Sequence, residues 1–127
     1  MRSVTITAAL LVATSATAQV IIDKSDAGMT EAQINQMYAV VTADFLDPGS
    51  AQFKGLTRSS PGYRPERTIC GFVNGKNSFG GYVGFRPFSF DSLNKLSFIY
   101  GETGIAAKAT NQVFLSSGCR SALGVTP

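Results

Sequence analysis

The chain has 127 residues, of which 11 are basic, 8 are acidic and none is histidine, so its net charge is +3. That charge is too small for the strongly basic surface that nucleic-acid binding requires, and we expect no nucleic-acid partner. The lack of histidine removes the most common metal ligand and the usual general base at neutral pH. The length fits one domain with a modest core.

The first 18 residues have the pattern of a secretory signal peptide. Residues 4–12 are largely apolar, and Ala16-Thr17-Ala18 has the small-x-small pattern that signal peptidases cleave. The alternatives are a buried N-terminal helix or a membrane anchor, but the apolar stretch is far shorter than the roughly 20 residues that span a bilayer. We expect cleavage after Ala18, which leaves a single periplasmic or secreted domain of residues 19–127 with no membrane anchor.

Charge is distributed unevenly in the expected mature chain. Without Arg2 its net charge is +2, yet residues 19–47 hold five acids and one lysine, whereas residues 48–127 hold nine basic residues and three acids. This division indicates either complementary surfaces that pack within one domain or a basic face for an anionic envelope component.

The first predicted element is a helix over residues 31–46, after an extended segment (residues 19–28) that turns at its end. Thr30 and Gln33 form a capping box at its start, and Pro48 cannot continue a helix, so the helix should end just before it. Between these signals, apolar residues recur at helical spacing and predict one buried stripe of Ile34, Met37, Tyr38, Val41 and Phe45.

Four strands are predicted next, because the apolar residues then alternate with period two. Short connections between them favour an antiparallel meander. The second strand should place Ile69 and Val73 on one face and Cys70 on the other. Pro87 lies within the third strand, and since it lacks the amide donor of a central strand, it predicts an edge position or a bulge. The predicted strands are residues 51–57, 67–74, 82–90 and 95–100.

The last predicted element is a helix over residues 105–117. Good helix formers at its start favour a helix, whereas Val113 and Phe114 leave a strand over residues 112–115 as the alternative. Gly118 fits a helix C-terminal cap, and residues 120–127 are expected to form a loose tail.

Cys70 and Cys119 are the two cysteines of the chain and predict one disulfide. An oxidising compartment and a small core both favour pairing in an exported chain of this size. The alternative, a nucleophilic thiol, would need a nearby base, and the chain has no histidine. With both cysteines paired only scattered carboxylates remain, so we expect no metal and no other cofactor.

The connection between the second and third strands is the best candidate for a functional loop, within CGFVNGKNSFGGY at residues 70–82. Structurally, Asn-Gly is a strong turn signal and the later glycines permit positive φ. Functionally, a rigid hairpin displaying amides and a lysine suits a carbonyl, carboxylate or sugar-like partner, unless the asparagines hydrogen-bond the loop's own backbone. The candidate binding residues are Asn74, Lys76, Asn77, Tyr82 and Arg86.

Two motifs in this region resemble a pattern found in small, uncharacterised exported proteins and lipoproteins of bacteria. They are Asp47-Pro48-x-Ser50-Ala51-x-Phe53 and, over residues 70–85, Cys-Gly-x-Val-Asn-x-Lys-Asn-x-x-Gly-x-Tyr-x-Gly-Phe. The resemblance implies a location in the bacterial envelope and no particular activity or catalytic residue. Many such proteins carry a lipid-attachment cysteine, but Gln19 rather than cysteine follows Ala18 here.

Two short stretches resemble enzyme signatures without their context. Residues 71–77 resemble a phosphate-binding loop, but one residue is missing between the glycines and Asn77 replaces the hydroxyl that would bind magnesium. Ser92 and Lys95 have the spacing of the serine-lysine pair of penicillin-recognising enzymes, but the companion motifs are absent and the chain is too short. Neither stretch indicates an enzyme.

Together these patterns predict an exported α+β domain, in which the N-terminal helix packs on a four-stranded antiparallel sheet and a C-terminal helix or strand is tied to it by the disulfide. Most aromatic residues should lie in the core. The expected function is a noncatalytic binding module of the bacterial envelope that recognises a protein or wall component through residues 74–82. The alternatives are a small hydrolase of envelope polymers, or a structural subunit that uses exposed strand edges.

Overall fold

The computed structural model describes residues 3, 8–9, 19–101 and 103–125. Most of the predicted signal peptide, residues 1–18, therefore lies outside the described residues, as do Glu102 and the last two residues. Among the helices that the structure describes, none is long and apolar enough to cross a membrane.

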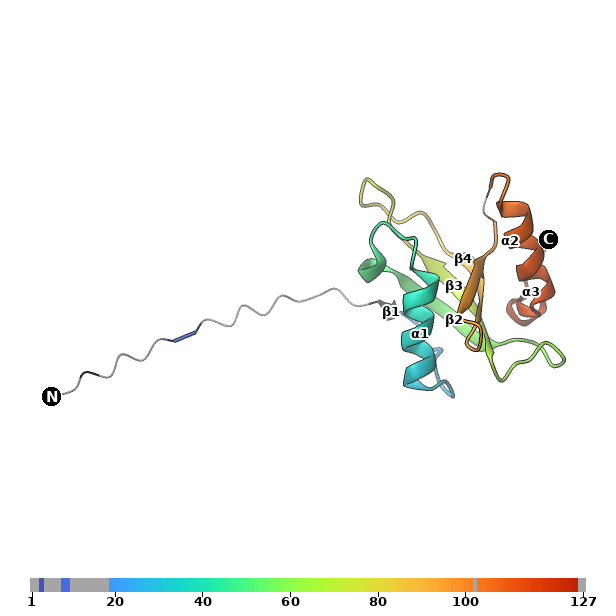
Figure 1. Cartoon of the computed structure of the whole chain (residues 1–127), viewed down its shortest axis with the longest axis horizontal. Helices are drawn as coiled ribbons and strands as arrows, with labels where there is room; N and C mark the ends of the chain where they lie inside the picture. Colours follow the sequence, from blue (N-terminus) through green and yellow to red (C-terminus); the bar gives the residue numbers. More distant parts are fainter. Residues whose placement is uncertain (1–2, 4–7, 10–18, 102, 126–127) are drawn as a thin grey trace.

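A five-stranded sheet lies between two helical layers in the described part of the chain (Figure 1). Helix α1 (Glu31–Val41) covers one face, and helices α2 (Ala107–Ser116) and α3 (Cys119–Leu123) cover the other. The strands lie side by side in chain order, and a short 3₁₀ helix, η1 (Pro48–Ser50), precedes the second of them. The strands are β1 (Val20–Ile21), β2 (Gln52–Arg58), β3 (Thr68–Asn74), β4 (Arg86–Asp91) and β5 (Leu96–Ile99). The predicted α+β class is confirmed.

Strand β1 makes the sheet mixed, which corrects the prediction of four antiparallel strands. It pairs in parallel with the start of β2, whereas the other neighbouring strands are antiparallel. After β1 the chain turns at Asp23, whose carboxylate accepts hydrogen bonds from the Ser25 hydroxyl (2.6 Å) and the Gly55 N–H (2.8 Å). These bonds lower the pKa of Asp23 and fix β1 beside the irregular register of β2, where Gly55 has φ +61°. Two residues are too few to show a period in sequence.

Helix α1 begins as predicted but ends at Val41 rather than at residue 46. The capping box forms, because the Thr30 hydroxyl accepts from the Gln33 N–H and the Gln33 side chain accepts from the Thr30 N–H. At the other end, Thr42 is buried and its hydroxyl donates to the Tyr38 carbonyl (2.6 Å), a local bond that competes with the helical ladder. Pro48 begins η1, which suits its fixed φ.

Pro87 lies in an interior strand in unbroken register with β3, so the predicted bulge is wrong, and an edge position holds only on the β5 side, where the ladder begins at Phe88. Strand β4 pairs with β3 in unbroken register and with β5 on its other side. The Pro87 carbonyl accepts from the Tyr100 N–H (2.8 Å), so the proline nitrogen faces the same side, just beyond the last residue of β5. The missing donor therefore costs the sheet one bond at a point where β5 has ended.

The C-terminal segment forms two helices tied to the sheet. Helix α2 confirms the predicted helix and excludes the alternative strand, and Gly118 follows it with φ +78°. The predicted loose tail is wrong over residues 120–123, because Cys119 begins helix α3, and residues 126–127 of that prediction lie outside the described residues. The predicted disulfide joins Cys70 and Cys119, with a Cα–Cα distance of 5.3 Å. This bond gives the short helix a fixed partner on β3 that its own sequence pattern does not reveal.

Two apolar cores lie on opposite faces of the sheet, and β3 contributes to both. Ile69 and Val73 pack in the larger core under α1, whereas Cys70 packs with Phe114 in the smaller core under α2 and α3, as the alternation predicts. The largest fully buried side chains are aromatic: Phe53, Phe88, Phe90 and Phe114. Four more aromatic residues are partly buried and pack against these cores, whereas Tyr63, Phe79 and Tyr82 are exposed.

Candidate functional site

The hairpin of residues 74–86, which joins β3 to β4, carries all five predicted binding residues. It projects from one end of the sheet, beside the segment that follows α1 (Figure 1). Lys76 and Tyr82 pair as an isolated antiparallel bridge, and the Val83 N–H donates to the Gly75 carbonyl (3.1 Å). Strand β4 begins only at Arg86, so the hairpin extends further than the loop predicted over residues 75–81.

Asn74 and Asn77 hold the backbone of this hairpin. The Asn77 Oδ1 atom accepts from the N–H groups of Phe79 (2.9 Å) and Gly81 (3.1 Å). Asn74 is buried, and its Oδ1 atom accepts from the Gly84 N–H (2.9 Å). Both side-chain oxygens therefore bind the loop's own backbone, which is the alternative to ligand binding that the sequence analysis left open. These bonds hold the tip in one conformation.

Alanine in place of Asn77 is expected to loosen the tip without unfolding the domain. The substitution removes the acceptor of two exposed N–H groups, so the free energy of unfolding should fall by less than about 1 kcal/mol. Amide exchange at Phe79 and Gly81, measured by NMR, should become at least about fivefold faster. In the variant these N–H groups have lost the hydrogen bonds that protect them from exchange. Asn35→Ala, an exposed asparagine of α1, is the control; equal exchange in both variants would contradict the bracing role.

Lys76, Tyr82 and Arg86 lie nearer the base of the hairpin. The Tyr82 hydroxyl donates to the Ser50 carbonyl (2.9 Å), which ties the hairpin to η1. The Lys76 ammonium lies 5.4 Å from the centroid of the Tyr82 ring, within reach of a cation–π interaction. Lys76 and Arg86 line one cavity of about 220 Å³, together with Asp44, Phe45, Leu46, Gly75 and Val83. Two of the predicted binding residues therefore line the same cavity as the segment that follows α1.

Close packing against Phe45 sets the position of the hairpin. A Cβ atom on Gly75 would lie 2.8 Å from the Phe45 ring, closer than side chains pack, so any larger residue would have to displace that ring. The sequence predicts that glycine is needed at position 75 for a turn. In the structure it is needed because the Phe45 ring, in the segment after α1, packs directly against the backbone. The hairpin is therefore held by packing and by hydrogen bonds together.

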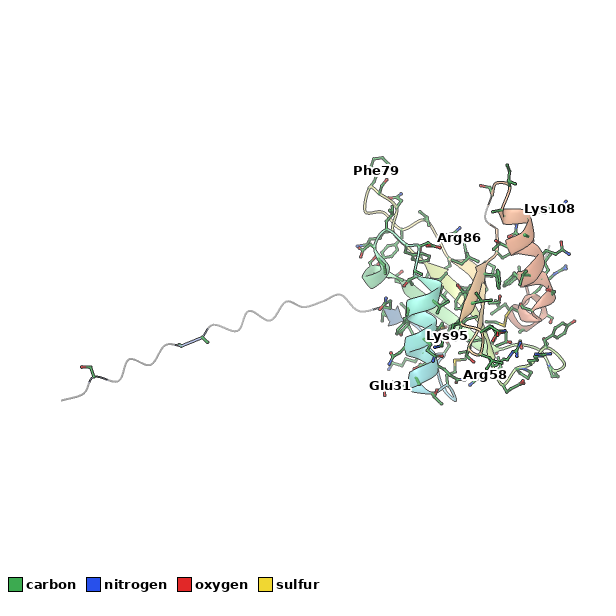
Figure 2. All side chains as sticks on the ribbon, in the orientation of Figure 1. Glu31, Arg58, Phe79, Arg86, Lys95 and Lys108 are labelled. Atoms are coloured by element: carbon green, nitrogen blue, oxygen red, sulfur yellow. A yellow bond between two sulfur atoms is a disulfide. The ribbon has the colours of Figure 1, made fainter. Side chains whose placement is uncertain are left out.

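The candidate binding residues predicted from the sequence do not include the exposed apolar side chains of this region. Phe79 is 94% exposed at the tip, where Figure 2 shows it pointing away from the body of the domain. Leu46 and Val83, which line the cavity at the base, are 73% and 57% exposed. Phe79 had one sequence signal, since it stands between Ser78 and two glycines, outside any strand alternation. We call Leu46, Lys76, Phe79, Val83 and Arg86 the hairpin patch.

Carboxylates do not converge in the described part of the chain. Within it, no three histidine, cysteine, aspartate or glutamate side chains lie together as metal ligands would. Four cavities of the described surface hold at most one carboxylate each, Asp44 or Asp91, whereas glycoside cleavage uses a pair. No protein-family model, curated protein or solved structure matches this chain.

Proposed function

We propose that the chain is a noncatalytic interaction module of the bacterial envelope that binds a partner protein through the hairpin patch. One observation carries the proposal: Phe79 is 94% exposed at the tip of a loop whose backbone is bonded to Asn77. Covering an apolar ring with a partner surface removes it from water, which favours binding. Because the loop is already ordered, its binding costs little conformational entropy.

The chemistry of the hairpin patch favours a protein partner over a wall polymer. Aromatic side chains contribute strongly to the energetics of protein interfaces, and the hairpin presents the Phe79 ring at its tip. Leu46 and Val83 extend the apolar surface at the base of the hairpin, in the cavity that Lys76 also lines. The matching partner surface has an apolar pocket that receives the Phe79 ring.

Export to an oxidising compartment is part of the same proposal. The Cys70–Cys119 disulfide supports it, because such bonds persist mainly outside the cytoplasm. The signal-peptide pattern of residues 1–18 and the resemblance to small exported bacterial proteins support it from the sequence. Cell fractionation of a C-terminally tagged chain, with mass determination of the mature N-terminus, tests the predicted cleavage after Ala18.

Phe79→Ala is expected to weaken partner binding at least about thirtyfold, since hot-spot aromatics contribute about 2 kcal/mol or more. Crosslinked capture from the native envelope identifies the partner, and titration of the purified pair gives the affinity. Leu93→Ala is the matched control, because Leu93 is 66% exposed in the β4–β5 turn, at the opposite end of the sheet. Equal partner affinity of both variants, or retention of the chain by purified wall polymer regardless of Phe79, would overturn the proposal.

A further inference from the structure

A separate cleft lies at the other end of the sheet from the hairpin patch. Its volume is about 360 Å³, within the range of small-molecule sites. Its floor is formed by residues of β3, β4 and β5, one wall by the loop between β2 and β3, and the other wall by α2. Tyr63, Phe98 and Val113 supply apolar surface to it.

Two polar groups of this cleft have no hydrogen-bond partner among the described residues. Ser89 lines the cleft and is 3% exposed, yet its hydroxyl takes part in none of the hydrogen bonds of the described side chains. The Nε atom of Arg67, which also lines the cleft, is shielded from solvent and has no acceptor within the same part of the chain. Buried polar groups are nearly always paired, which makes the Arg67 Nε atom an exception, whereas the unused Ser89 hydroxyl is not shielded from solvent and can donate to an acceptor in the cleft.

The charged groups of the cleft are held in place. The Arg67 Nη2 atom lies 3.2 Å from the Asp91 Oδ2 atom, which orients the guanidinium group. Arg64 has a left-handed backbone, with φ +57°, and strain of this kind at a residue other than glycine concentrates at functional sites. Two arginines and one aspartate line the cleft, so its net charge is +1.

The loop wall of the cleft is fixed to the C-terminal helices. The Ser60 and Ser121 hydroxyl oxygens lie 2.7 Å apart, and a Cβ atom on Gly118 would lie 2.5 Å from Tyr63. Because Cys119 is bonded to β3, the wall, the helices and the floor form one connected unit. The cleft is thus formed before any ligand enters, which reduces the entropic cost of binding.

We propose that this cleft binds a small carboxylate that carries an apolar group. The Ser89 hydroxyl and the Arg67 guanidinium donate to the carboxylate oxygens, and Tyr63 and Phe98 contact the apolar group. One excess positive charge matches one carboxylate rather than a doubly charged phosphate. Such a carboxylate is either a free acid or the C-terminus of a peptide, and both present the same group to the cleft.

Titration of the ¹⁵N-labelled chain, with its disulfide formed, tests this proposal by NMR. N-acetyl-L-phenylalanine should cause saturable shifts centred on Thr68, Ser89 and Asp91, and N-acetyl-L-phenylalaninamide, which has no charge, should bind at least about tenfold more weakly. The peptide Ala-Ala-Phe distinguishes the two sources: tighter binding than the acetylated acid assigns a peptide C-terminus, and weaker binding assigns a free acid. Equal binding of acid and amide, or shifts elsewhere, would overturn the carboxylate site.

Three variants connect the shifts to the cleft. Arg67→Gln should weaken binding of N-acetyl-L-phenylalanine at least about tenfold, and Ser89→Ala, which leaves the Arg67–Asp91 pair intact, at least about threefold. Lys108→Gln is the charge control, because Lys108 is an exposed residue of α2 outside the cleft and its loss should leave the affinity unchanged. Wild-type affinity in both cleft variants contradicts the proposal. Phe79→Ala should bind the acid normally, so this test is independent of the hairpin patch.

Discussion

The double substitution Cys70→Ala/Cys119→Ala is expected to lower the free energy of unfolding by about 4 kcal/mol. The bond joins residues 49 positions apart, and closing a loop of that length removes conformational entropy from the unfolded chain. Domains of this size are stable by roughly 5–15 kcal/mol, so the variant loses a large share of its stability. Urea denaturation followed by circular dichroism, with and without the substitutions, measures the difference.

Reduced wild-type protein is the control for this experiment. Both cysteines are fully buried beside Phe114, so the double variant also removes two sulfur atoms from the smaller core. Reduction of the wild type breaks the bond but keeps both sulfur atoms, and it should reproduce most of the loss. If reduced and oxidised protein unfold within about 1 kcal/mol of each other, the packing of α3 rather than the bond holds the C-terminal segment on the sheet.

Local chemical signals in the sequence predicted the elements that depend on neighbouring residues. The capping box of Thr30 and Gln33 marks the start of α1, because both bonds form within one turn. The two-residue period of β3 likewise assigns Ile69 and Cys70 to opposite cores, since strand geometry alone decides the face. Such signals need no knowledge of the rest of the chain.

The presence of two cysteines in a short chain predicted the disulfide, but the other features that depend on distant residues were not predicted. Strand β1 exists because β2 offers it a pairing edge and Asp23 bonds Gly55, a residue far along the chain. Helix α3 is short and is held by the Cys119 bond to β3. The interior place of Pro87 depends on where β5 happens to end. In each case the deciding partner belongs to another element.

The same distinction applies to the two sites. An asparagine before glycine in a turn predicts self-bonding, and Asn74 and Asn77 do bond the hairpin backbone. Phe79 is exposed because no other described element packs over the tip, and a sequence pattern does not show this. The cleft is still harder to foresee, because Arg67, Ser89 and the residues of α2 come from separate elements that only the folded sheet and the disulfide bring together.

Phe53→Ala is expected to lower the free energy of unfolding by about 3–5 kcal/mol. Phe53 is fully buried between α1 and the sheet, with its ring centroid 5.2 Å from that of Tyr38 and 5.7 Å from that of Phe88. The substitution removes apolar area from the core and leaves a cavity between two elements that cannot fully collapse. Chemical denaturation of the variant measures the loss.

Phe79→Ala is the matched control, because it makes the same chemical change at a ring that is 94% exposed. Its free energy of unfolding should stay within about 0.5 kcal/mol of the wild type. A loss comparable to that of Phe53→Ala would mean that the tip packs on the domain, and Phe79 would then not be available to a partner. With stability unchanged, the expected loss of partner affinity in Phe79→Ala is due to the missing contact itself, whereas Phe53→Ala should lose binding only in proportion to its unfolded fraction.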